Sequence, residues 1–322
     1  MIKSFFGTKE YRLWAWGGLI FLFSITWLQV YLTVQINTWY GEFYNILQKA
    51  DDIEAFWASM TKFTFLAIPY IFVAMGVFYF AQHYAFRWRQ AITYYYIPLW
   101  EKCPSTIEGA SQRIQQDTYE FAKSLESLGL GLFKAILTLI AFIPILWTLS
   151  EKITVDYLDG IDGSLVYIAL ITSIGGMLVS YVVGIKLPGI EYDNQKCEAA
   201  YRKQLVFSED DKIYAKQETL FELFTGLKTN YFRMFNHYSY FSLWGNLYSQ
   251  VMIILPYLIM APSLFVGAAT LGVITQTGNA FGKVNDSFSY LIDHWTDITK
   301  FLSVIKRLRE FERLLLQGYK TV

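Results

Sequence analysis

The sequence predicts an all-α integral membrane protein with six transmembrane helices per protomer and long cytoplasmic extensions. Hydrophobic residues make up 54% of the 322 positions and charged residues only 17%, whereas soluble domains carry about 25% charged residues. Several apolar runs are long enough to cross a bilayer, and basic residues gather in alternate connections between them. The 24 Tyr and 10 Trp are typical of aromatic belts at the membrane interface. A net charge of zero argues against a nucleic-acid partner.

Six apolar segments are the candidate spans, because each strong one has roughly the length that a hydrocarbon core of about 30 Å requires. They are residues 13–34, 63–80, 128–149, 165–185, 243–260 and 264–281. The last is the weakest, since Thr, Gln and Asn interrupt it. The N-terminal residues lack a short apolar core followed by a small-residue cleavage site. The first segment is therefore expected to be retained as a span rather than removed as a signal peptide.

The orientation follows from the basic residues, which cluster in 3–12, 87–113, 196–216 and 306–313. The alternate connections are poor in positive charge, and Lys152 lies among acidic residues. The positive-inside rule therefore places both termini in the cytoplasm. The cytoplasmic connections are long and helical in pattern, so several spans are expected to continue as rods beyond the bilayer. No repeat or linker divides the chain, and residues 1–322 are predicted to form one membrane domain.

A first polar column precedes the third span. Wound at about 100° per residue, one face of the helix predicted over 107–149 carries Glu108, Gln112, Gln115, Tyr119, Lys123 and Glu126. The opposite face carries apolar residues, including Ala110, Ile114 and Phe121. Two interpretations stay open for this column: a solvated helix face, or the wall of a water-filled cavity. Lys134 lies within the third span, either near the same face or reaching toward the interface.

Two further columns have the same character. Glu191, Glu198 and Glu209 share one stripe, and i,i+4 pairing of Glu198 with Arg202 explains only part of it. The sixth span and its extension carry a stripe of Gln276, Asn279, Lys283, Asp286, Tyr290 and Asp297. Polar residues at membrane depth are costly and usually face a bundle interior or a water-filled cavity. This third stripe is the clearest indication of a pathway.

Other patterns in the sequence give less information about function. Residues 37–44 are rich in aromatic side chains, which favours an interface belt over a ligand site. Gly176, Ser180 and Gly184 have the four-residue spacing that lets two helix backbones approach closely. The segment 278–283, GNAFGK, lacks the spacing and the Ser/Thr of a phosphate loop. The three histidines are isolated, and Cys103 and Cys197 are expected to be free thiols. The sequence thus predicts no enzyme, no cofactor, no metal and no nucleotide.

Long stretches resemble the SbmA/BacA-like peptide transporters, which are bacterial inner-membrane proteins that take up peptide antibiotics. Among these stretches are HYAFRWR at 83–89, IEGASQRIQQDTYEFAKSLESLG at 107–129, GIKLPGIEYDNQKCEAAYRKQLVFSED at 184–210 and TLGVITQTGNAFGKV at 270–284. The resemblance implies the fold of the transmembrane part of an ABC exporter without ATPase domains. It also implies a homodimer around a large central cavity and import driven by the proton gradient.

The resemblance further implies that cavity glutamates take up the protons. The matching acids are Glu126, Glu198 and Glu209, and Glu191 and Glu108 are the next acids to consider. At Gln116 the family pattern prefers Glu, so one proton-accepting group is replaced. The expected lining of the substrate cavity is Gln116, Tyr119, Lys134, Gln276, Asn279, Lys283, Asp286 and Tyr290.

The expected function is proton-driven import of peptides and peptide-like antibiotics by alternating access. The expected partners are a second copy of the chain, membrane lipids and peptide substrates. Two alternatives remain. One is the membrane subunit of an ATP-driven transporter that recruits a separate ATPase, and the other is a membrane scaffold that transports nothing.

Overall fold

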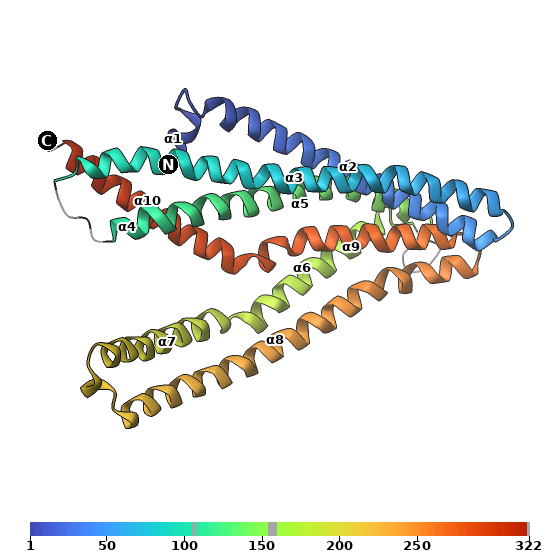
Figure 1. Cartoon of the computed structure of the whole chain (residues 1–322). Coiled ribbons are helices and arrows are strands. Elements are labelled where there is room, and N and C mark those ends of the chain that lie inside the picture. The colour runs from blue at the N-terminus through green and yellow to red at the C-terminus, as the bar shows by residue number, and fades with distance from the viewer. Residues whose placement is uncertain (105–106, 108, 154–159, 321–322) are drawn as a thin grey trace. The chain divides into compact units, whose positions relative to one another are not determined.

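The computed structural model describes the backbone of residues 1–104, 107, 109–153 and 160–320. Every regular element within these residues is helical (Figure 1). The helices are α1 Ile2–Phe6, α2 Arg12–Lys49, α3 Ile53–Glu101, α4 Ala110–Gln112, the π turn η1 Arg113–Asp117, α5 Thr118–Ser150, α6 Ser164–Gly184, α7 Leu187–Asp210, the 3₁₀ turn η2 Lys212–Tyr214, α8 Gln217–Phe265, α9 Leu271–Asp293 and α10 Trp295–Lys320. The predicted all-α membrane class is confirmed.

Five helical stretches are long and apolar enough to cross a membrane: Arg12–Lys49, Ile53–Glu101, Ala110–Ser150, Ser164–Asp210 and Gln217–Phe265. The segment predicted as a sixth span, 264–281, is divided in the structure. Residues 264–265 end α8, and the residues from Leu271 onward begin α9. A turn that contains Gly267 separates the two helices. Gly267 has φ of +79°, which few residues other than glycine adopt. Six crossings therefore stay a prediction.

The chain divides into two compact units, one formed by residues 1–170 and 256–322 and the other by residues 171–255. In the first unit, α2 and α3 run antiparallel and pack closely (Figure 1). Gly18 permits this approach, because a Cβ there would lie 2.8 Å from the ring of Tyr84. The Tyr84 hydroxyl donates a hydrogen bond to the carbonyl oxygen of Ala15 at 3.0 Å.

An aromatic core joins α1, α3 and α10 at the end of this unit that holds the N-terminus. Phe5 stacks on Trp88 with ring centroids 5.0 Å apart, and Tyr96 meets Phe311 edge to face at 5.4 Å. The amino group of Met1 donates to Glu312 at 2.9 Å. The C-terminal end of the long apolar helix α3 therefore lies in a packed core, where large side chains are buried against other side chains and not against lipid.

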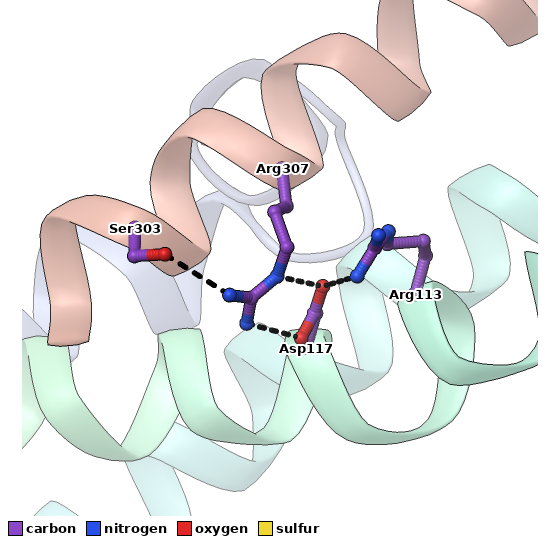
Figure 2. A network of polar contacts seen from close by, with 4 residues as sticks. All are labelled: Arg113, Asp117, Ser303 and Arg307. Carbon is purple, nitrogen blue, oxygen red and sulfur yellow. Dashed lines mark hydrogen bonds and ion pairs between the residues drawn. The ribbon is translucent and has the colours of Figure 1, made fainter. Parts of the chain in front are cut away.

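A polar network ties α10 to the π turn beside this core (Figure 2). The carboxylate of Asp117 accepts hydrogen bonds from Arg113 and, through both oxygens, from Arg307. Arg307 also donates to the hydroxyl of Ser303 at 3.0 Å. Asp117 is almost fully buried, so its charge is balanced by two guanidinium groups rather than by water.

In the second unit, the part of α6 beyond residue 170 packs against α8 through a ladder of small residues facing aromatic ones. A Cβ on Gly176 would lie 2.1 Å from the ring of Tyr248, and one on Gly184 would lie 3.0 Å from Phe241. Between them, the indole N–H of Trp244 donates to the Ser180 hydroxyl at 2.9 Å. The small residues at four-residue spacing on α6 therefore accommodate aromatic rings of α8. The sequence had predicted that the backbone of a second helix approaches there.

Candidate functional site

The polar face of the first unit lies on the pair α5 and α9, which run side by side (Figure 1). The Tyr290 hydroxyl lies 3.4 Å from the carbonyl oxygen of Ser127 and 3.3 Å from that of Leu128, and donates to both. Gly131 makes this approach possible, since a Cβ there would lie 2.1 Å from the Tyr290 hydroxyl oxygen. α9 is thus fixed to α5 at the start of the apolar stretch of α5.

Ionisable side chains lie on both helices of this pair. Glu126 is half-buried on α5, close to the site where Tyr290 docks. Lys134 belongs to the apolar stretch of α5, Lys283 and Asp286 belong to α9, and all three side chains are exposed in the single protomer. Lys283 is near enough to interact electrostatically with both Lys134 and Asp286. The pair α5 and α9 therefore presents charged groups of both signs on one open side.

The remaining residues expected from the third stripe follow α9 toward its N-terminus. Asn279 is exposed, and Gln276 is half-buried against α2. Asp297 lies on α10, beyond the turn at His294 that ends α9. Asp297 still interacts electrostatically with Tyr290 across this turn, and one stripe through Asp297 stays a prediction.

The second column lies on a single unbroken helix, which is the condition on which its predicted stripe depends. α7 carries Glu191 and Glu198, which are half-buried, and Glu209, which is exposed. The Tyr231 hydroxyl of α8 donates to Glu198 Oε1 at 2.8 Å, and the Asn230 amide donates to the sulfur of Cys197 at 2.8 Å. These contacts join α7 to α8 and fix the position of the Glu198 carboxylate.

The first column keeps its predicted faces, with Gln112, Gln115 and Lys123 exposed and Ala110 and Phe121 buried, but a π turn interrupts it. The π turn at Arg113–Asp117 adds an extra residue to one helical turn, so a wheel of about 100° per residue does not hold across it. Gln116 lies exposed in this turn, and Glu108 lies outside the described residues. Tyr119 is exposed, and its ring lies 5.2 Å from the Arg89 guanidinium carbon and 5.6 Å from the Lys123 ammonium.

The expected acids thus fall into two groups. Glu126 belongs to the first unit, and Glu191, Glu198 and Glu209 belong to the second. The contacts and the burial given above for each acid are those within its own unit. Their convergence on one cavity stays a prediction.

Sequence reasoning missed a polar face on α2. Thr26, Gln29 and Asn37 are buried in the first unit, whereas the sequence predicted an apolar span over residues 13–34 and an aromatic belt over residues 37–44. The signal was present in the sequence as polar or small residues every three or four positions. These are Thr26, Gln29, Thr33, Asn37, Gly41, Asn45 and Gln48. The aromatic residues between them, such as Trp39 and Tyr40, hid the pattern.

Carboxyl, ammonium, amide and phenol groups are distributed along helices instead of converging on one reacting atom. Within the described part of the chain, no three His, Cys, Asp or Glu side chains lie together as metal ligands would.

Comparison with known proteins agrees with these features. The model of the SbmA/BacA-like family matches residues 8–316. The chain is 26% identical over 312 residues to the inner membrane ABC transporter ATP-binding protein YddA of Escherichia coli, covering 89% of this chain and 55% of that protein. It is 26% identical over 314 residues to an uncharacterized ABC transporter ATP-binding protein, sll0182, of Synechocystis, covering 91% and 45%.

A plant protein is similar over the same region. The chain is 27% identical over 317 residues to the chloroplastic ABC transporter D family member 2 of Arabidopsis thaliana, covering 91% of this chain and 42% of that protein. The chain therefore spans about half the length of the curated relatives that it matches.

Proposed function

The chain belongs to the SbmA/BacA-like family, whose members are membrane transporters, and from this premise we propose that it imports peptides and peptide-like antibiotics, driven by the proton gradient. The proposed location is the bacterial inner membrane, with both termini in the cytoplasm. The proposed assembly is a homodimer that encloses a cavity and opens alternately to the two sides.

The observation that carries this proposal is the charged open side of α5 and α9. Lys134, Lys283 and Asp286 are exposed in the protomer beside helices that are apolar enough to span a membrane. Charged side chains facing lipid are costly, so such groups face a bundle interior or a water-filled cavity. A twofold partner would cover these groups and enclose water around them, because the same face is supplied by both copies.

The proposed coupling uses Glu126, Glu198 and Glu209. A carboxyl group exposed to the acidic outer side takes up a proton, and it releases the proton when the cavity opens to the cytoplasm. Ionised acids attract cationic peptides, so the charge of the substrate and the state of protonation are linked. The difference in proton binding between two packings of the dimer would then bias their equilibrium.

Uptake of a labelled cationic peptide into proteoliposomes, with and without a pH gradient, tests the proposal. We expect accumulation only when the outside is acidic, and we expect a proton-conducting ionophore to abolish it. Accumulation that is indifferent to the gradient would contradict proton coupling. Empty liposomes and liposomes that hold an unrelated membrane protein are the controls.

The names of the relatives favour one second candidate. YddA and sll0182 are named ABC transporter ATP-binding proteins, and this chain spans only about half of their lengths. The alternative is therefore a membrane subunit that works with a separate ATPase. In cells depleted of ATP while the proton gradient is held, uptake would stop under this alternative and continue under the proposal above.

A further inference from the structure

Two lysines from neighbouring helices meet on the open side of α5 and α9. The contact of Tyr290 with Gly131 sets the register of this helix pair. The two helices run antiparallel (Figure 1), so residues after Gly131 on α5 face residues before Tyr290 on α9. Lys134 follows Gly131 by three residues, and Lys283 precedes Tyr290 by seven, or about two helical turns. Both ammonium groups thus belong to the same stretch of the pair, where they interact electrostatically.

The backbone of each lysine is held by buried neighbours. Ala135 directly follows Lys134, Val284 directly follows Lys283, and both are buried in the first unit. The ring of Phe133 stacks on Phe23 of α2 with centroids 4.0 Å apart. The two lysine side chains are exposed at the edge of this packed face. Their positions are therefore set by the helix bundle, while their ammonium groups stay accessible from the open side.

The charges around Lys134 do not balance it. Lys134 lies in the apolar stretch of α5, and the charged group that acts on it is the ammonium of Lys283. Asp286 acts on Lys283 from one turn further along α9. Among the described residues, neither lysine has a carboxylate at ion-pair distance. Because a charge in an apolar stretch is costly without a counterion, the two lysines favour the binding of an anion.

An acid lies on the same helix at a distance that a short peptide can span. Glu126 precedes Lys134 by eight residues, about 12 Å along the axis of α5. An extended chain covers at most about 3.3–3.6 Å per residue, so three or four residues span this separation. The open side therefore offers positive and negative groups at a spacing that fits a peptide with charges of both signs.

We propose that Lys134 and Lys283 form a carboxylate site, which binds the C-terminal carboxylate of a peptide substrate. Each ammonium group has three N–H donors, so the two lysines can each donate to one oxygen of the carboxylate. A cationic side chain three or four residues before the C-terminus of the peptide then lies near Glu126. The site rests on the proposed function, because its ligand is the transported peptide.

Equilibrium binding of one peptide in two chemical forms tests the site. The probe is a labelled cationic peptide, made with a C-terminal carboxylate and with a C-terminal carboxamide. Each form is titrated into full-length protein in nanodiscs at neutral pH, without a gradient. We expect wild-type protein to bind the carboxylate form about tenfold more tightly. Lys134→Gln and Lys283→Gln should each bind the two forms equally.

Lys152→Gln is the matched control, because it removes the same charge from an exposed position just after α5. It should keep the wild-type preference for the carboxylate form. Equal binding of the two forms by wild-type protein would overturn the proposal. That result is expected if the two lysines instead reach the phosphate groups of lipids.

Two further measurements separate charge from structure. Lys134→Arg keeps a positive charge and donors that match a carboxylate, so it should keep the preference. If this variant binds the two forms equally, packing and not charge explains the effect, and the proposal fails. Lys134→Gln should leave the melting temperature unchanged or higher, since it removes the repulsion between two ammonium groups.

Binding and transport distinguish this site from the proposed function. If wild-type protein prefers the carboxylate form but accumulates neither form under a pH gradient, the proposed function fails and the carboxylate site stands. If the gradient drives uptake while the two forms bind equally, the carboxylate site fails and the proposed function stands.

Discussion

Asp117 and Arg307 form a two-point ion pair between segments that lie 190 residues apart. The Nε and Nη2 groups of Arg307 donate to the two carboxylate oxygens at 3.0 and 2.8 Å (Figure 2). Asp117 belongs to the π turn and is 1% exposed. The pair therefore fixes α10 to the helix that carries Glu126, and it does so outside the apolar stretch that begins about 16 Å further along that helix.

Asp117→Asn should lower the stability of the purified protein by roughly 1–3 kcal/mol. Loss of one member of a fully buried pair costs about 3–5 kcal/mol, and the cost here is smaller because Arg307 is 37% exposed. The melting temperature in detergent measures the effect. Glu42→Gln is the matched control, since its pair with Lys62 is exposed and worth at most about 1 kcal/mol. Equal shifts for the two variants would contradict the assigned role of Asp117.

The same pair predicts a dependence of stability on pH. Burial acts to raise the pKa of the Asp117 carboxyl, but hydrogen bonds and charge from Arg307 and Arg113 hold the pKa below its usual range. A depressed pKa contributes stability above the unfolded value of about 3.9, and this contribution is lost as the pH falls through the folded value.

The measurement is the melting temperature between about pH 6 and about pH 2.5. Wild-type protein should lose stability more steeply below about pH 4 than Asp117→Asn, which lacks the titrating group. Other carboxyls contribute equally to both proteins and cancel in the difference. Parallel curves of melting temperature against pH for the two proteins would show that the arginine partners do not lower the pKa of Asp117 in the folded protein.

Gly131→Ala should weaken the docking of α9 on α5. Its Cβ would lie 2.1 Å from the Tyr290 hydroxyl oxygen, so the ring must move. Overpacking of this kind costs about 1–3 kcal/mol. Gly129→Ala is the control, because nothing lies within 4 Å of its Cβ and alanine favours the helix by about 0.5–1 kcal/mol. The melting temperature should fall for the first variant and rise slightly for the second.

A further variant identifies the cause. In a Tyr290→Ala background, Gly131→Ala should no longer be destabilising, because the atoms that the new methyl group meets are gone. If the loss persists in that background, the contact with Tyr290 is not its origin.

Gly176 and Gly175 offer a second matched pair, in the other unit. A Cβ on Gly176 would lie 2.1 Å from the Tyr248 ring, whereas nothing lies within 4 Å of one on Gly175. Gly176→Ala should therefore destabilise by about 1–3 kcal/mol, and Gly175→Ala should not. Limited proteolysis of the α7–α8 connection and the melting temperature should both distinguish the two. The same response to both variants would argue against the aromatic ladder.

The long helices and most polar columns were predictable from the sequence. Apolar length set the spans, and three- or four-residue spacing placed Glu191, Glu198 and Glu209 on one unbroken helix. The π turn before Thr118 was not predictable, because a helical wheel assumes a constant angle per residue. The turn at His294, which divides α9 from α10, was not predictable for a related reason: a wheel carries no information on where a helix ends.

Tertiary partners were the other part that the sequence left open. Gly176 and Gly184 were recognised as sites of close approach, but spacing alone does not say whether a backbone or an aromatic ring approaches. Tyr248 and Phe241 fill those positions because α8 presents them at matching intervals. The burial of Asn37 was likewise missed, since average hydropathy over a window conceals a narrow polar face on an aromatic-rich helix.

The final prediction concerns the acids proposed to couple transport to protons. Glu126→Gln, Glu198→Gln and Glu209→Gln each remove one group that can gain and lose a proton, while they nearly preserve its shape. Each should reduce gradient-driven uptake by about tenfold or more, the change produced by about 1.4 kcal/mol of lost coupling. Glu151→Gln is the control. It lies exposed just after α5, so its uptake should match the wild type.

Uptake and folding are measured on the same preparations, so that a loss of transport is not mistaken for a loss of protein. The Glu126 and Glu209 variants should keep the wild-type melting temperature. Glu198→Gln still accepts from the Tyr231 hydroxyl through its amide oxygen, so the contact at 2.8 Å survives the change. If all three variants transport at the wild-type rate with the wild-type pH dependence, these glutamates do not couple the proton gradient, and Glu191 and Glu108 become the acids to replace.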